Sequence, residues 1–89
     1  MTREEKLRIC KNVLTKLNNT KLLFFLCLLF NEEGHNIEDF PEVMKYKPKD
    51  ADYVWWGDYS YNGAMRSKKQ HRRLRKNLMK KAIKDLETQ

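Results

Sequence analysis

The chain has 89 residues and a formal net charge of +7. A chain of this length excludes a multidomain protein, so we expect residues 1–89 to form one small domain. Residues 1–65 carry nine Lys and Arg against ten Asp and Glu, whereas residues 66–89 carry ten against two. The excess positive charge is therefore confined to the last quarter of the chain, which favours an anionic partner there.

The two cysteines, Cys10 and Cys27, fall within apolar helical patterns and lack the spacing of a redox motif or a zinc site. No pattern typical of a signal peptide is recognised, so we expect reduced thiols and a cytoplasmic location in a host cell. Two buried free thiols are the simpler interpretation. One disulfide between neighbouring helices is the alternative.

The first predicted helix covers residues 3–17. Thr2 followed by Glu5 is a capping-box pattern, and apolar residues then recur at helical spacing up to Leu17. Asn18 and Asn19 end this helix, and Thr20 is the expected N-cap of the next one. Because the connection is very short, we expect these two helices to form an antiparallel pair.

The second predicted helix contains the run Leu22–Phe30, which is entirely apolar. About 20 apolar residues are needed to cross a bilayer, so we expect no membrane span. We expect a helix that is buried on all sides and ends near residues 31–33, with Gly34 in a left-handed C-cap. The alternative is that one side of Leu22–Phe30 forms a homodimer interface.

The middle of the chain, residues 34–63, is irregular and mildly acidic. A short helix is predicted through residues 40–46, because Pro41 suits a first helical turn, and Pro48 ends it. Residues 50–63 are dense in aromatic side chains and turn formers, which indicates an ordered loop.

The last predicted helix begins with a second capping box, Ser67 and Gln70. Apolar residues at helical spacing, Leu74, Leu78, Ala82 and Leu86, form one stripe, and lysines and arginines occupy the opposite face. The sequence therefore predicts an all-α fold, a domain of three to four helices in which an ordered aromatic loop precedes a long basic C-terminal helix.

The stretches FPEVMKYKP and YVWWGDY, followed by the helix RKNLMKKAIKDLE, resemble a loose class of short uncharacterised proteins of phages and mobile elements. That class has a Phe-Pro-Glu turn, a Lys-Pro step, a Tyr/Trp cluster and a closing helix with an early arginine, which corresponds to Arg75. The basic segment RSKKQHRR makes the approach to the helix longer here. The resemblance implies a phage-type accessory protein and no particular activity.

The outer face of the last helix is the first candidate site, because cations spaced along a helix can follow phosphates and release counterions. A plain solvated surface is the alternative. The predicted face consists of Lys68, Lys69, Arg72, Arg73, Lys76, Lys80 and Lys84.

A pocket is the second candidate site. His71 and Arg75 lie on the same side of the helix as its apolar stripe, so they point inward, and a charge directed at the core needs a partner. We predict a ligand-binding pocket in which a planar phosphate-bearing ligand stacks on aromatic rings and is neutralised by Arg75, with the residues Trp55, Trp56, Tyr59, His71 and Arg75. Core packing of the tryptophans and a salt bridge from Arg75 to a central acid are the alternatives.

No catalytic residue, metal site or cofactor is predicted, because no zinc-ligand spacing, Gly-rich phosphate loop or nucleophile motif is present. The expected function is a small non-catalytic phage-type protein that sequesters or blocks an anionic partner, such as a nucleotide messenger or a nucleic-acid-bearing complex, in counter-defence. One alternative is a nucleic-acid-binding regulator that uses the basic helix. Another is an inhibitor that docks on an acidic patch of a host protein.

Overall fold

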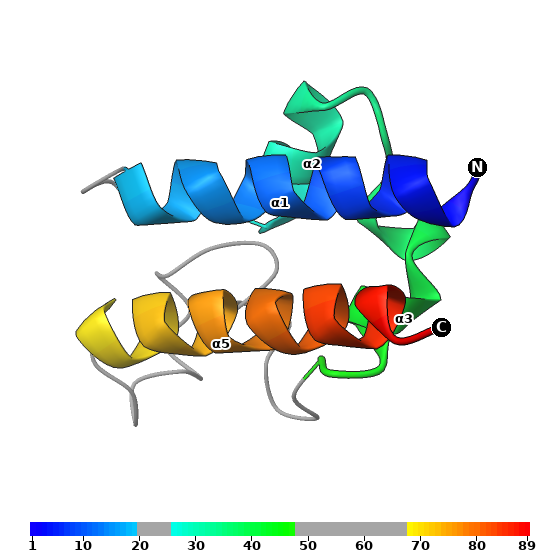
Figure 1. Ribbon diagram of the computed structural model, residues 1–89. Helices are drawn as coiled ribbons and strands as arrows, with labels where there is room; N and C mark the ends of the chain where they lie inside the picture. The colour runs from blue at the N-terminus through cyan, green and yellow to red at the C-terminus, as the bar shows by residue number, and fades with distance from the viewer. Residues whose placement is uncertain (20–25, 48–67) are drawn as a thin grey trace.

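The computed structural model describes residues 1–19, 26–47 and 68–89 (Figure 1). The elements in chain order are α1 (Arg3–Asn19), α2 (Leu26–Glu32), the 3-10 helix η1 (Ile37–Asp39), α3 (Pro41–Met44) and α5 (Lys68–Glu87). The described ranges contain helices and connections and no β-strand, which confirms the all-α prediction and the long C-terminal helix. No helix in these ranges is long and apolar enough to span a membrane.

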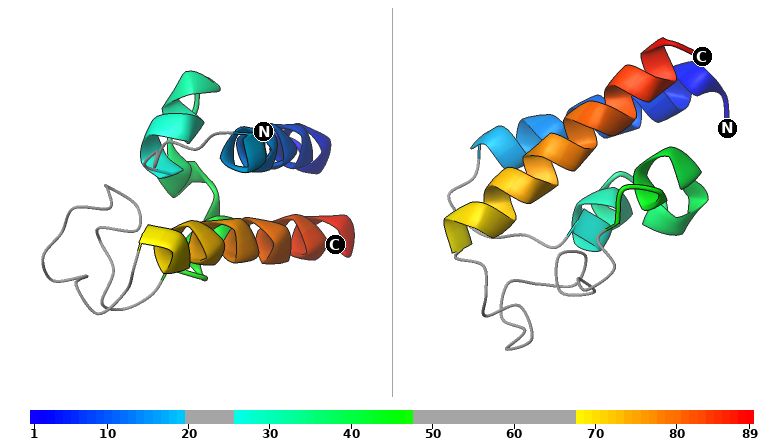
Figure 2. Two further views of the ribbon diagram at one scale, coloured as in Figure 1. Left: turned by 90° about the vertical axis from the view of Figure 1, so that its left-hand side faces the viewer. Right: turned by 90° about the horizontal axis from the view of Figure 1, so that it is seen from below.

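The two long helices, α1 and α5, lie side by side and run in opposite directions (Figures 1 and 2). Their pairing brings the first and last residues together: Arg3 Nη1 donates hydrogen bonds to the backbone carbonyls of Leu86, at 3.5 Å, and Gln89, at 2.8 Å. The next described helix, α2, also contacts α1, over a shorter stretch than α5 does, and the expected antiparallel arrangement of α1 and α2 stays a prediction. Among the described helices, only α5, with 20 residues, matches the 17-residue α1 in length.

The start of α1 follows its local sequence. The Glu5 N–H donates to Thr2 Oγ1 at 3.2 Å, and the Lys6 N–H donates to the Thr2 carbonyl at 3.0 Å. These bonds satisfy N–H groups that the first turn of a helix leaves without internal partners. The predicted cap is thus present, and the helix continues to Asn19, two residues beyond its predicted end.

The end of α2 also matches its prediction. Gly34 adopts the left-handed conformation with φ of 81°, and the His35 N–H donates to the Phe30 carbonyl at 3.0 Å. Glycine adopts this conformation without steric cost. The chain then turns through η1, where the Asn36 side chain accepts from the Glu38 N–H at 2.9 Å, and enters α3 at Pro41 as predicted.

The apolar run in α2 is not covered on every side. Leu26, Leu29 and Phe30 are buried, but Leu28 is 40% exposed and Cys27 is only half-buried. The expected burial on all sides was therefore wrong for the described part of this helix, because α1 and η1 cover only the side that they contact. Residues 20–25 lie outside the described ranges, and a homodimer through this segment stays a prediction.

One apolar core joins the described helices. It includes the rings of Phe30 and Phe40, whose centroids lie 4.8 Å apart. The predicted inner stripe of the last helix contributes Leu78, Ala82 and Leu86, all buried. This packing fixes the rotation of α5, and the rotation decides which of its side chains face outward.

Both cysteines are free thiols. Cys10 is fully buried in the core, and this burial raises the pKa of its thiol to about 12. Burial also raises the pKa of the half-buried Cys27 thiol. The disulfide alternative is therefore absent from the structure.

Candidate functional site

The cations of the last helix lie on the outer surface of α5, because its apolar stripe is turned into the core. Between Lys68 and Lys84 the sequence contains no Asp or Glu. Lys69, Arg73, Lys80 and Lys84 are exposed. The helix thus presents one uninterrupted basic surface over four turns.

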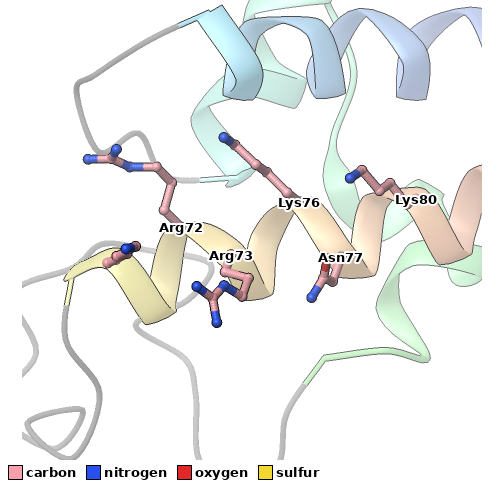
Figure 3. A pocket seen from close by; sticks show the side chains of 6 residues that line it. Arg72, Arg73, Lys76, Asn77 and Lys80 are labelled. Atoms are coloured by element: carbon pink, nitrogen blue, oxygen red, sulfur yellow. The ribbon is translucent and has the colours of Figure 1, made fainter.

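Six side chains of α5 surround an open hollow of about 300 Å³ (Figure 3). Five of them are cationic and the sixth is a carboxamide. We call this set the basic hollow; it consists of Lys69, Arg72, Arg73, Lys76, Asn77 and Lys80.

Five described cations outside the basic hollow form ion pairs with carboxylates. Lys6 lies 3.1 Å from Glu42, Lys16 lies 3.0 Å from Glu33, and Lys45 lies 2.7 Å from Asp85. By contrast, no carboxylate of the described ranges lies within ion-pair distance of four members of the basic hollow. These four are Lys69, Arg73, Lys76 and Lys80. The acids of the described ranges therefore leave these four cations without an ion-pair partner.

This arrangement is electrostatically unfavourable in the free protein. Lys69 and Arg73 are four residues apart, as are Arg72 and Lys76 and also Lys76 and Lys80. Each like-charged pair at this spacing costs about 0.2–0.5 kcal/mol on an exposed helix. Lys69 also lies in the first turn of α5, where the helix dipole is already positive. A bound polyanion would relieve this repulsion.

The inward-pointing Arg75 is fully buried, as its position on the helix predicts. Desolvation lowers the pKa of its guanidinium from 12.5 to about 10, so Arg75 remains charged at neutral pH. Its side chain has an interaction partner. Arg75 is thus separate from the basic hollow, and its complete burial supports a structural role.

The rest of the predicted pocket is untested. Trp55, Trp56 and Tyr59 lie outside the described residues. His71 belongs to α5, but its side chain is outside the described set, as is that of Lys68. The pocket therefore stays a prediction, and the outer face is the site for which the structure supplies geometry.

The structure refines the predicted basic face in two ways. Lys84 is exposed on the same helix but does not line the basic hollow. Asn77 does line it, although counting charges alone did not select this residue. The signal in the sequence was its spacing, because Asn77 lies four residues after Arg73 and one turn places both on the same side.

Other polar clusters in the described ranges connect structural elements. The Tyr46 hydroxyl donates to Asp85, whose carboxylate also contacts Lys45, so the segment after α3 is tied to α5. His35 packs edge-on against Phe40, with ring centroids 6.1 Å apart. No group of three or more His, Cys, Asp or Glu in the described ranges has the geometry of a metal site.

Comparisons with protein-family models, with curated proteins and with solved structures find no match to this chain. Function is therefore argued from the chemistry of the basic hollow. Ammonium and guanidinium groups in this arrangement bind phosphate oxygens through charge-assisted hydrogen bonds, and arginine adds a planar two-pronged donor.

Proposed function

We propose that this protein binds nucleic acid without catalysing a reaction, and that α5 holds the phosphodiester backbone along the basic hollow. The observation that carries the proposal is a row of cations on one helix face, four of which have no carboxylate partner in the described ranges. Phosphates with regular spacing would neutralise these cations and release condensed counterions.

The extent of the basic hollow favours a polymer over a small anion. From Lys69 to Lys80 the helix axis rises by about 17 Å, at about 1.5 Å per residue. A single phosphate group would neutralise one or two of the five cations and leave the others in mutual repulsion. A chain of phosphates would engage them in succession.

This proposal corresponds to one of the functions expected from the sequence, the nucleic-acid-binding regulator. The nucleotide-sequestering function depends on Trp55, Trp56 and Tyr59, which lie outside the described residues. The phage-type counter-defence role depends on the resemblance alone and stays a prediction. The open form of the basic hollow favours a backbone over a small ligand.

The test is fluorescence anisotropy with labelled duplex and single-stranded oligonucleotides between 50 and 200 mM salt. If five cations each contact one phosphate of a duplex, the log–log salt slope is about −4.5, and affinity falls about 500-fold over this range. A variant with three substitutions, Lys69→Gln, Lys76→Gln and Lys80→Gln, should have a salt slope of about −2. Its affinity should fall only about 12-fold between 50 and 200 mM salt.

A matched control separates the basic hollow from net charge. Arg8→Gln, Lys11→Gln and Lys81→Gln remove the same charge from exposed positions elsewhere, and these should leave the slope nearly unchanged. Circular dichroism checks that both triple variants are folded. Equal slopes for the two variants would exclude the basic hollow as the site. The absence of salt-dependent binding by the parent protein to any nucleic acid would refute the proposed function.

A further inference from the structure

Five labelled side chains of the basic hollow leave α5 in two directions (Figure 3). Arg72, Lys76 and Lys80 extend toward the side on which α1 lies, whereas Arg73 and Asn77 extend away from it. At about 100° per residue, Arg73 and Asn77 lie roughly 160° and 200° around the helix from the buried Arg75. They therefore form the ridge of α5 that points straight away from the core.

No described helix covers this ridge (Figure 2). Seen from below, α5 lies in front of α1 and crosses it at an angle, and α2 and α3 lie to one side. Arg73 and Asn77 are both exposed. The ridge is thus open to a partner that approaches α5.

Asn77 lies on this exposed ridge, and neither folding nor phosphate binding explains it. Asparagine in a helix interior is less favourable than alanine by up to about 0.7 kcal/mol. Within the described ranges, its carboxamide makes no hydrogen bond. A surface that only held phosphates would gain more from lysine or arginine at this position.

Base recognition accounts for this residue. A carboxamide presents one acceptor and one donor in a plane, which matches the N6 amino group and N7 of adenine in the major groove. A guanidinium similarly matches O6 and N7 of guanine. Arg73 and Asn77 are separated by about 6 Å along the helix axis, or about two base-pair steps.

Building on the proposed function, we propose that α5 lies in the major groove of B-form DNA, where Asn77 reads adenine and Arg73 reads guanine. Arg72, Lys76 and Lys80 then face the phosphates at one edge of the groove. An α-helix with its side chains is about 10–12 Å across, which fits a groove about 12 Å wide. The deep, narrow major groove of duplex RNA does not admit it, and a single strand offers no groove.

The experiment begins with selection of preferred sites from duplexes with a randomised centre. Affinity is then measured for the selected site, for the same site with 7-deazaadenine, which lacks the N7 acceptor, and for a scrambled duplex. The parent protein should prefer the selected site over the scrambled one by about 5- to 150-fold per base contact. It should lose the adenine part of this preference with 7-deazaadenine.

Asn77→Ala is the diagnostic variant, because alanine favours the helix and the protein should remain folded. It should bind the selected and 7-deaza duplexes equally while keeping the salt slope of the parent. Lys76→Gln is the matched contrast, and it should keep the base preference and lose about one unit of slope.

The outcomes separate the two proposals. Salt-dependent binding without sequence preference, or an unchanged adenine preference in Asn77→Ala, would overturn base reading and leave the proposed function intact. Tighter binding of duplex RNA or of single strands than of duplex DNA would overturn the placement in the major groove. A parent protein that binds no nucleic acid would overturn both proposals.

Discussion

The ion pair between α1 and α3 offers a direct test of how this fold is held together. Lys6 Nζ lies 3.2 Å and 3.1 Å from the two carboxylate oxygens of Glu42. The side chains are only 19% and 14% exposed, so their attraction is less screened than that of a surface pair. Exposed pairs contribute about 0–1 kcal/mol, and breaking a fully buried pair costs about 3–5 kcal/mol. We therefore expect Glu42→Gln to destabilise the protein by about 1–2 kcal/mol.

The assay is thermal unfolding followed by circular dichroism. A chain of 89 residues has an unfolding entropy of about 0.2 kcal/mol/K, so the melting temperature should fall by about 5–10 °C at pH 7. Glu38→Gln is the control, because Glu38 is exposed and has no ion pair in the described ranges. A Glu42→Gln variant that melts with the Glu38→Gln control would refute the stabilising role of the pair.

The same pair predicts a pH dependence. Burial acts to raise the pKa of the Glu42 carboxyl, but hydrogen bonds from its own backbone N–H and from Lys6 outweigh this effect and hold the pKa below 4.5. The stabilisation of the protein by this ion pair is thus complete above pH 4.5. It is lost as the pH falls through the lower pKa that the Glu42 carboxyl has in the folded state. Glutamine resembles the protonated acid, so the melting temperatures of parent and variant should converge in this acidic range. A gap that persists at pH 2 would contradict the assignment.

Three further predictions concern the core. Phe30→Ala should cost about 3–5 kcal/mol, seen as a large loss of melting temperature, because Phe30 is fully buried against Phe40. A thiol reagent should label Cys27 in the native protein and Cys10 only after denaturation, because Cys10 is fully buried with a pKa raised to about 12 by desolvation. Equal labelling rates would contradict this packing. Arg75→Lys should lower the melting temperature and leave DNA affinity within about twofold, because Arg75 is fully buried and separate from the basic hollow. An unchanged melting temperature with lost nucleotide binding would instead favour the predicted pocket.

Local features of the fold were predictable because their causes are local. The capping bond to Thr2, the left-handed Gly34 and Pro41 at the start of α3 each follow from one residue and its nearest neighbours. The inward rotation of Arg75 followed from the period of the helix. Each of these features depends on residues that are close together in the sequence.

Pairings between distant segments were not predictable in the same way. An apolar stripe shows that a helix has a buried side, but it does not identify the partner, so the packing of α1 along α5 was missed. The contact between Lys6 and Glu42 was missed for the same reason. In the candidate site, the basic face was visible in the sequence. That no carboxylate of the described ranges pairs with four of its cations could be seen only once the helices were packed.

The partnership of the first and last helices also sets the order of events during synthesis. At about 5–20 residues per second, the ribosome needs about 2–10 seconds to make residues 20–67 after α1 is complete. Most of the stability of an amphipathic helix comes from packing of its apolar face, so α1 has little lasting structure until α5 emerges to cover it. Ile9 and Val13, which are buried in the folded protein, are exposed to water during that interval. The nascent chain therefore presents its first apolar stripe to chaperones for seconds, and the native core closes only after the last helix has been made.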